Sequence, residues 1–273
     1  MKSILLHIDH DPAMTARLQV ALDLARATNG HVTCLQLVSY DVFMPGDFNG
    51  SAAAAMLPVI SENADRLQAL TERALAHEGV PFDWRREHGA AGQRLVEAAR
   101  LADIVILGPA EAGSDGRGPS ALIGDVALHA PVPVMVVPED ARSFDVGAPM
   151  LVAWNGSAEA AHALQAAAPL LACSCQVTLV HAVDAEPDPA DPAALPPTDG
   201  ARYLARHGIA CQIVELPRGD ASVADTLLAA AQLRECAVIV MGAYGHSRLA
   251  QLVLGGVTRT MLSAPALPVL LAH

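Results

Sequence analysis

Aromatic side chains and positive charge are both scarce in this 273-residue sequence. Aromatic residues make up 3% of it, and 17 Lys and Arg stand against 29 Asp and Glu, which gives a formal net charge of −12. A surface of this kind repels phosphate backbones and offers few rings on which bases can stack. The composition therefore excludes a nucleic acid as partner, and any anionic ligand must be held by local groups rather than by the overall field.

Long apolar runs and a cleavable leader are also missing. No apolar run is long enough to span a bilayer, and the N-terminal MKSILLHIDHD lacks the small-residue cleavage site of a secretory signal. The five cysteines are odd in number and scattered among apolar segments, which is typical of small core residues rather than of a disulfide framework. We expect a cytoplasmic protein with no membrane partner.

Apolar residues are abundant, at 52%, and they form strand-like runs that alternate with amphipathic helical stretches. This alternation predicts an α/β fold in which helices cover both faces of a parallel sheet. In the first half, helices are expected at about Pro12 to Thr28, Ala53 to His77 and Gly92 to Ala102. The expected strands are Ser3–Ile8, His31–Val38, Phe82–Glu87, Ile104–Leu107 and Val132–Val137 in the first half, and Met150–Trp154, Gln176–Ala182, Ala210–Glu215, Ala237–Met241 and Pro268–Leu271 in the second.

The two halves of the sequence repeat each other. LADIVILGPA matches ECAVIVMGAY, with Gly108 aligned to Gly242, and ALHAPVPVMVV matches MLSAPALPVLL, with Ala130 aligned to Ala264, so both pairs share an offset of 134 residues. A constant offset indicates two copies of one domain. We predict domains at residues 1–140 and 149–273, joined by the polar, proline-bounded linker PEDARSFDVGAP.

The copies differ at their second helix. Where the first copy has a long amphipathic stretch, the second has AEPDPADPAALPPTDG. Its prolines remove backbone donors and forbid a continuous helix until about Gly200. We expect a mobile surface loop there.

The densest glycine pattern lies near the C-terminus, in MGAYGHSRLAQLVLGG. The spacing is Gly242-x2-Gly245-x9-Gly255-Gly256, from the end of a buried strand to the start of a helix at about Val257. Two explanations stand at this point: ordinary turn and helix-stop geometry, or a backbone cradle for phosphate at a helix N-terminus. The pattern is neither a Walker loop nor the dinucleotide fingerprint.

This spacing, followed by a small residue, a helix and APALPVLL, closely resembles the universal stress protein family. The resemblance covers nearly the whole chain as two tandem domains, and VAWNGSAEAA is similar to the family's first strand and the turn after it. It implies two Rossmann-like domains of the adenine nucleotide alpha hydrolase-like type, each an open five-stranded parallel sheet in the order 3-2-1-4-5 with helices on both faces. It also implies that the fifth strands of the two domains pair antiparallel, which makes an intrachain pseudo-dimer.

The ATP-binding branch of the family further implies a site for an adenine nucleotide (ATP, ADP or AMP) in the second domain. Any Mg²⁺ would be held mainly through the phosphates. Carried over by position, Ala153, Trp154 and Asn155 would line the adenine and Ala182 would cover it, Met241 and Gly242 would lie along the ribose, and Gly245, Gly255, Gly256, Val257 and Thr258 would offer donors to the phosphates.

Two positions depart from the family pattern. Asn155 replaces the usual Asp, so the adenine edge meets an amide that can donate and accept instead of a carboxylate that only accepts. Gly256 stands where the family usually has Ser or Thr, which deletes one hydroxyl donor. One hydrogen bond to a charged group is worth about 1.5–3 kcal/mol, so binding survives its loss at reduced affinity.

The first copy departs further. Pro109 stands where the chain should present amides, and Glu111 and Asp115 add negative charge beside any phosphate. Gly124-Asp125 is expected to open the next helix with a carboxylate at its anion-binding end. His7 takes the place of Ala153 and would intrude on the adenine. We predict that this copy keeps the fold and has lost the nucleotide.

Other motifs carry weaker signals. HIDHD, with His7 and His10, holds metal-ligand residue types, but a strand-end histidine and a helix-capping Asp11 explain it better, and Cys173-x-Cys175 lacks a second pair. Ser157 is expected to cap the helix that runs into Glu159 to Leu171 rather than to act as a nucleophile. We therefore predict no metal site.

The functional expectation is a stress-response binding and signalling module with no catalytic residue. Met241 to Thr258 contains no carboxylate and no lysine, and phosphoryl transfer needs a positioned base and charge neutralisation. The alternatives are a nucleotide-free scaffold that acts through dimerisation and protein partners, and a slow ATPase. Whole chains could also form a homodimer, but nothing in the sequence fixes that surface or a protein partner.

Overall fold

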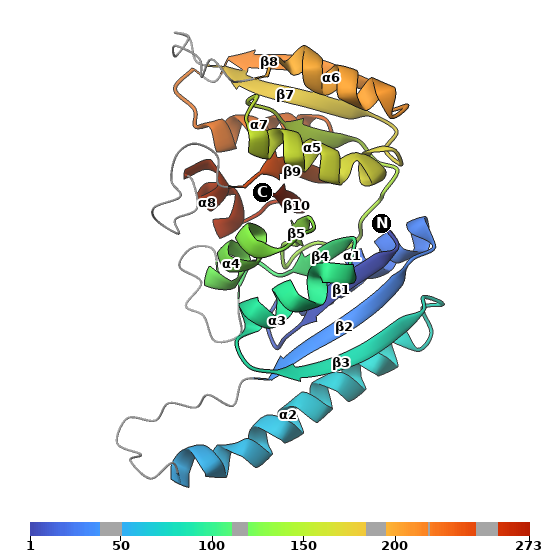
Figure 1. Cartoon of the computed structure of the whole chain (residues 1–273), viewed down its shortest axis with the longest axis vertical. Coiled ribbons are helices and arrows are strands. Elements are labelled where there is room, and N and C mark those ends of the chain that lie inside the picture. Colours follow the sequence, from blue (N-terminus) through green and yellow to red (C-terminus); the bar gives the residue numbers. More distant parts are fainter. Residues whose placement is uncertain (39–50, 111–119, 184–194, 218, 244–255) are drawn as a thin grey trace.

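The computed structural model describes residues 1–38, 51–110, 120–183, 195–217, 219–243 and 256–273. Its elements alternate between strand and helix in both halves of the chain (Figure 1). Strand and helix bounds agree with those expected from the sequence to within a few residues. The first half contains β1 (Ser3–Ile8), α1 (Met14–Thr28), β2 (His31–Val38), α2 (Ser51–Leu75), β3 (Phe82–His88), α3 (Ala91–Ala98), the short 3-10 helix Ala99–Leu101, β4 (Ile104–Leu107), α4 (Ala121–His129) and β5 (Val134–Val136).

The second half repeats this order after the linker. It contains β6 (Met150–Ala153), α5 (Ala158–Leu171), β7 (Val177–Val183), α6 (Pro197–Arg206), β8 (Cys211–Pro217), α7 (Val223–Leu233), β9 (Val238–Gly242), α8 (Gly256–Ser263) and β10 (Val269–Ala272).

All the strands of the described chain join one open sheet, in the order β3-β2-β1-β4-β5-β10-β9-β6-β7-β8. Each half therefore has the predicted order 3-2-1-4-5, with parallel pairing inside it. The halves meet where β5 pairs antiparallel with β10, with Met135 opposite Leu270. The predicted antiparallel pairing of the two fifth strands is confirmed.

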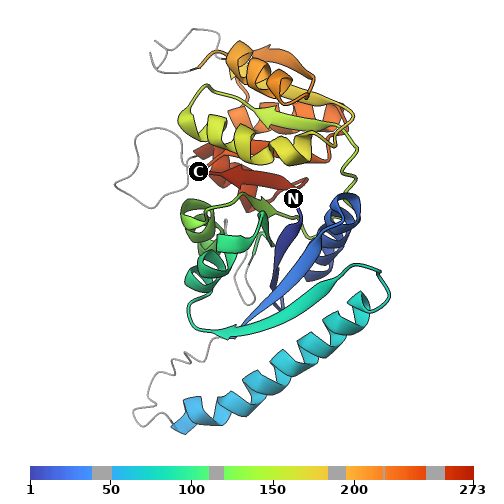
Figure 2. The same cartoon turned by 45° about the vertical axis from the view of Figure 1, so that its right-hand side comes forward.

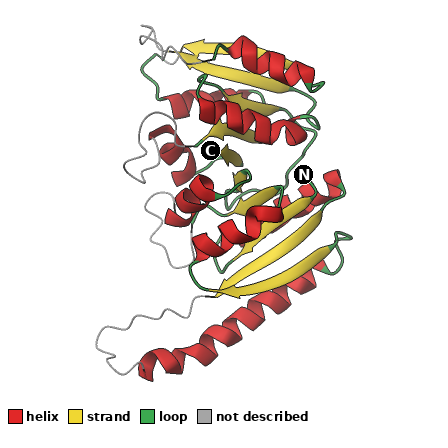
Figure 3. Cartoon of the chain, viewed as in Figure 1, coloured by secondary structure: helices red, strands yellow, loops and turns green. Residues whose placement is uncertain are grey.

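Helices cover both faces of the sheet (Figure 3). Side chains of alternate strand residues enter opposite faces, so the apolar core is divided into two clusters. One cluster packs against α1, α2, α5 and α6, and includes Ile4, Leu6, Val152 and Leu164. The other packs against α3, α4, α7 and α8. The carboxyl ends of the parallel strands in each half share one edge, which is where ligands bind in open α/β sheets.

Capping residues explain where α1 ends and where α5 begins. Asn29 adopts the left-handed conformation that ends α1, with φ of 49°. Ser157 begins α5, where its side chain accepts a hydrogen bond from the Ala160 N–H, as predicted. The start of α1 was placed wrongly: the helix begins at Met14 rather than Pro12, because residues 11–13 form a tight turn instead.

The linker is mostly polar in sequence, but its two large apolar residues are buried in the structure. Phe144 and Val146 are buried in the core cluster that contains α1 and α5. The backbone N–H of Phe144 also donates to the Asp23 carboxylate at 2.9 Å. The linker is therefore packed against both halves rather than suspended between them.

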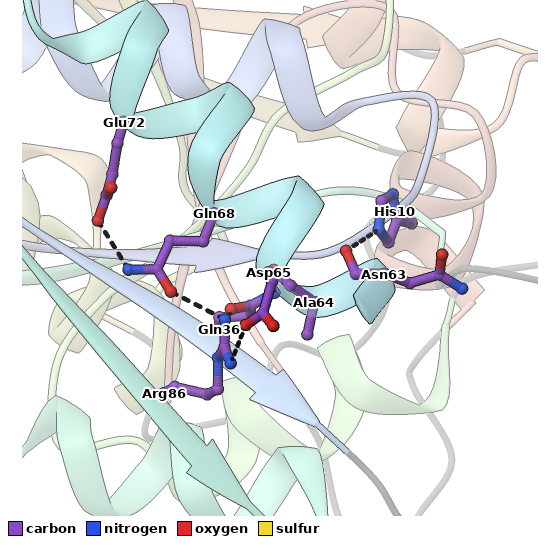
Figure 4. A network of polar contacts seen from close by, with 8 residues as sticks. All are labelled: His10, Gln36, Asn63, Ala64, Asp65, Gln68, Glu72 and Arg86. Atoms are coloured by element: carbon purple, nitrogen blue, oxygen red, sulfur yellow. Dashed lines mark hydrogen bonds and ion pairs between the residues drawn. The ribbon is translucent and has the colours of Figure 1, made fainter. Parts of the chain in front are cut away.

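The second helices differ in length, as the prolines predicted. α2 spans 25 residues and runs along β3 at one end of the molecule (Figure 2), whereas α6 spans 10 residues and begins at Pro197. Most of the segment expected to be a loop lies outside the described residues. α2 is fixed to the sheet by a polar network (Figure 4), in which Gln36 of β2 donates to the Ala64 carbonyl and accepts from Arg86 of β3. Within the described part of the chain, no helix is long and apolar enough to cross a membrane.

Candidate functional site

The candidate site lies where β6, β7 and β9 end in the second copy. Ala153 ends β6 beside β9, whose last residues are Met241 and Gly242. Ala153 and Met241 both contact the core cluster that includes α8. Ala182 lies two residues after Val180 of that same cluster, so strand alternation puts it on the same face. Ala153, Met241 and Ala182 are thus brought together on the α8 face of the sheet, whereas position 242 faces the first turn of α5.

Asn155 follows them at the start of the turn into α5. Its side-chain oxygen accepts a hydrogen bond from the Ser157 N–H at 3.2 Å, and the residue is exposed. This local bond fixes the amide group at the strand end, with its oxygen engaged by the turn. Among the described residues the amide nitrogen makes no hydrogen bond, so its donors are available to a ligand.

Trp154 lies apart from this set because its side chain enters the opposite face. The residue is 3% exposed and packs in the cluster that contains α5 and α6. Its indole N–H donates to the Leu195 carbonyl at 3.0 Å, and its backbone N–H donates to Val180 of β7. Only the backbone of Trp154 is therefore at the candidate site.

Gly242 has a packing role that sequence reasoning missed. A Cβ built on it would lie 2.7 Å from the backbone nitrogen of Ala160 and 2.7 Å from the carbonyl carbon of Glu159, in the first turn of α5. The equivalent Gly108 is similarly crowded, by Arg17, Asp11 and Ala13 of the first copy. Both strand ends thus require glycine so that the first helix of each domain, or the turn before it, can approach closely.

We expect Gly242→Ala to destabilise the chain by about 1–3 kcal/mol, because the methyl group meets helix backbone that cannot rotate away. Urea unfolding followed by circular dichroism measures this change. Gly256→Ala is the matched control, since a Cβ there meets nothing within 4 Å. Equal stability of the two variants would contradict the packing role of Gly242.

The remaining predicted residues lie around the start of α8. Gly256 opens the helix, Val257 is half-buried and Thr258 is 4% exposed. Because nothing among the described residues lies within 4 Å of a Cβ built on Gly256, the first residue of this helix is accessible. Gly245 and Gly255 lie outside the described residues.

At the corresponding strand ends of the first copy, a buried arginine binds the backbone and a carboxylate from the α1 side. Arg17 of α1 is completely buried, and it donates through Nε to the His7 carbonyl at 2.7 Å and through a terminal nitrogen to Asp11 at 2.6 Å. It also forms an ion pair with the second oxygen of Asp11. At the equivalent position in the second copy stands Ala163. No motif in the sequence indicated this buried arginine.

His7 itself is buried and neutral at physiological pH. Burial, reinforced by the positive charge of Arg17 and opposed by Asp9, lowers the pKa of His7 from 6.5 to about 4. His7 stands where Ala153 stands in the second copy, so an imidazole occupies the place of a methyl group.

Two helix-cap predictions for the first copy are wrong. Asp11 does not cap α1; its carboxylate accepts from the Ala13 N–H in a turn and pairs with Arg17. Asp125 does not open α4, which begins at Ala121 with Ser120 accepting from the Leu122 N–H. Asp125 lies one turn further on, where it pairs with His129 and packs over Gly92. The first turn of α4 is therefore capped by a serine, and Leu122 fills the position of the accessible Gly256.

The metal-ligand residue types in HIDHD and at Cys173 and Cys175 are not brought together as a metal site. Among the described residues, no three His, Cys, Asp or Glu side chains are grouped as metal ligands require. Cys173 and Cys175 are exposed at the turn between α5 and β7, and all five cysteines are free thiols.

Comparison with known proteins shows similarity along the whole chain. The Universal stress protein family matches residues 1–138 and again residues 148–273. The crystal structure of a universal stress protein from Archaeoglobus fulgidus is similar with a TM-score of 0.75 at 16% identity, over 98% of this chain and 97% of that one. A universal stress protein structure from Pseudomonas aeruginosa matches with a TM-score of 0.57 at 18% identity, over 100% and 93% of the two chains. No curated protein sequence matches the chain.

Proposed function

Because the chain belongs to the universal stress protein family, we propose that it is a stress-response binding and signalling module whose second domain holds one adenine nucleotide. The domains are taken as residues 1–140 and 149–273. The proposal rests on the difference between the two copies at the carboxyl ends of their strands. The second copy keeps small residues and an open helix N-terminus there, whereas the first copy has larger side chains at the equivalent positions.

The second copy offers the groups that each part of a nucleotide requires. Ala153 and Ala182 leave room for a flat base on the α8 face, and the Asn155 amide can donate to its edge. The first turn of α8 points unpaired N–H groups toward the strand end, where an anion is stabilised by the helix dipole. Gly245 and Gly255 would bring further backbone donors to the phosphates.

The ligand class is ATP, ADP or AMP, and the chain's own residues bind and orient rather than catalyse. Between Met241 and Thr258 there is no carboxylate and no lysine, so Mg²⁺ would be held through the phosphates and hydrolysis would be slow. A slow ATPase is thus the less favoured reading. We place the module in the cytoplasm, where the free thiols stay reduced.

We expect titration calorimetry of the full chain with ATP and Mg²⁺ to give a stoichiometry of one. In the first copy His7 and Leu122 stand where the second copy has Ala153 and Gly256, and Ser120 caps the first turn of α4. Two sites per chain would contradict the asymmetry. No binding by any adenine nucleotide would favour the nucleotide-free scaffold.

Gly245→Val tests the location of the site. A β-branched side chain fills the space that a phosphate needs, so we expect ATP binding to be lost while the unfolding midpoint stays unchanged. The matched control is Glu111→Val, because Glu111 is the equivalent residue of the first copy. Loss of binding in the control, or its persistence in Gly245→Val, would contradict the assignment.

A further inference from the structure

Among the described residues, β8 is the outermost strand of the sheet in the second copy. The other end of the sheet order is β3. On β8 the side chains of Cys211, Ile213 and Glu215 share the α6 face with Leu179 of β7, which lies opposite Ile213. Ile213 is 40% exposed, although it is a large apolar residue in the middle of a strand.

The two edges of the sheet are protected very differently. β3 carries Asp83, Arg85, Arg86 and Glu87, and α2 runs along it and is joined to it by the polar network of Figure 4. β8 has the sequence CQIVELP, with Glu215 as its single charged residue. Natural proteins use charge and covering helices to prevent edge strands from pairing with other chains. β3 has both safeguards, whereas β8 has one charged residue and its neighbouring helix α6 leaves Ile213 40% exposed.

A groove beside β8 is left open by the short helix α6. Its volume is about 420 Å³, and it is shallow and largely apolar. The walls are formed by Ala201, Ala205 and Arg202 of α6, by Ile209 in the turn, and by Cys211 and Ile213 of β8. The uncovered Ile213 is therefore part of a continuous apolar strip rather than a single exposed side chain.

Local charge favours a second copy of this chain as the occupant. The chain carries a formal charge of −12, so two copies repel each other over most of their surfaces. The stretch from Pro197 to Pro217 is an exception, because two acidic residues, Asp199 and Glu215, are balanced by Arg202 and Arg206. The protein also already joins two such sheets by antiparallel pairing of charge-free edges, at β5 and β10.

We propose that two chains associate by antiparallel pairing of β8 with β8 of a second copy, about a two-fold axis at Ile213. A two-fold axis puts the same residue of each chain opposite itself, so the two exposed Ile213 side chains cover each other. The same register sets Glu215 opposite Cys211 of the other copy, whose groove is lined by Arg202. Each Glu215 carboxylate is thus set beside the groove that holds the ion pair of Arg202 with Asp199 in the other copy. This proposal does not depend on nucleotide binding.

The mass of the full chain in solution tests it, by sedimentation equilibrium or light scattering across micromolar concentrations. We expect a dimer for the wild-type chain and a monomer for Ile213→Lys, since two like charges would then be directly opposed. Leu233→Lys is the matched control: it adds the same charge at a residue that is 82% exposed at the end of α7, and it should stay dimeric. A monomeric wild-type chain, or a dimer that persists in Ile213→Lys, overturns the proposal.

Cross-linking provides a second measurement that does not depend on a disrupted interface. Ile213→Cys treated with a short bismaleimide should give a covalent dimer on denaturing gels at a yield at least about tenfold above Leu233→Cys and the wild type. The wild-type chain is a necessary reference because Cys173 and Cys175 are exposed. Equal yields for the two variants would place position 213 away from any two-fold axis and overturn the register.

Discussion

Replacing Arg17 with methionine is expected to destabilise the chain by about 3–5 kcal/mol. The substitution removes the partner of a buried Asp11 carboxylate and the donor to the His7 carbonyl, and an uncompensated buried charge is among the most costly defects that a single mutation can create. Denaturant unfolding measured by circular dichroism gives the change.

Two variants separate the ion pair from the simple loss of a long side chain. Arg26→Met removes a half-exposed arginine that pairs with Asp23 and Glu78, and it should cost at most about 1 kcal/mol. Adding Asp11→Asn to Arg17→Met should restore part of the lost stability, because the unpaired charge is then gone. If Arg17→Met costs no more than Arg26→Met, the buried pair does not stabilise the fold.

The second large effect is a loss of stability in mild acid through His7. Its pKa in the folded chain is about 4, against 6.5 for an exposed histidine, so below pH 6.5 the unfolded chain binds a proton that the folded chain does not. The stability from neutral His7 is present above pH 6.5 and is lost as the pH falls toward 4. The total is about 3 kcal/mol, of which about 2 kcal/mol is lost by pH 5.

His7→Gln isolates this contribution from that of the other titrating groups. We expect the difference in unfolding free energy between the wild type and the variant to shrink or reverse by about 2 kcal/mol between pH 7.5 and pH 5, because the amide cannot take up a proton there. The wild type should be the protein that loses more. A difference that is the same at both pH values would show that His7 is not held neutral by burial.

Much of the fold could be predicted because the sequence contains two copies of the same domain pattern. The repeat at a constant offset, with Gly108 aligned to Gly242, identifies two equivalent domains, and the alternation of strand and helix defines each one. Pairing of the fifth strands was implied by the family resemblance, and their apolar character agrees with it, since an exposed edge of that kind would aggregate. These are patterns of many residues, which a single substitution does not disturb.

The site was less predictable, because its details depend on single side chains. Strand alternation did contain one signal: Trp154 follows Ala153 directly, so its side chain must enter the other face. No comparable signal existed for Arg17, since arginine in a helix is normally exposed and only the folded chain reveals its buried partner. The crowding at Gly242 likewise arises from a helix elsewhere in the sequence.

The β5–β10 pairing also makes the contact between the two domains an intramolecular one. In a pair of separate subunits such an edge contact would dissolve on dilution, but here the linker holds both strands at a high effective concentration, so the contact is independent of how much protein the cell makes. Whatever it binds, the first domain contributes the edge that covers β10. A truncated chain that began after the linker would expose the apolar strand Val269–Ala272. We expect such a chain to precipitate rather than to remain in solution with a weaker affinity for its ligand.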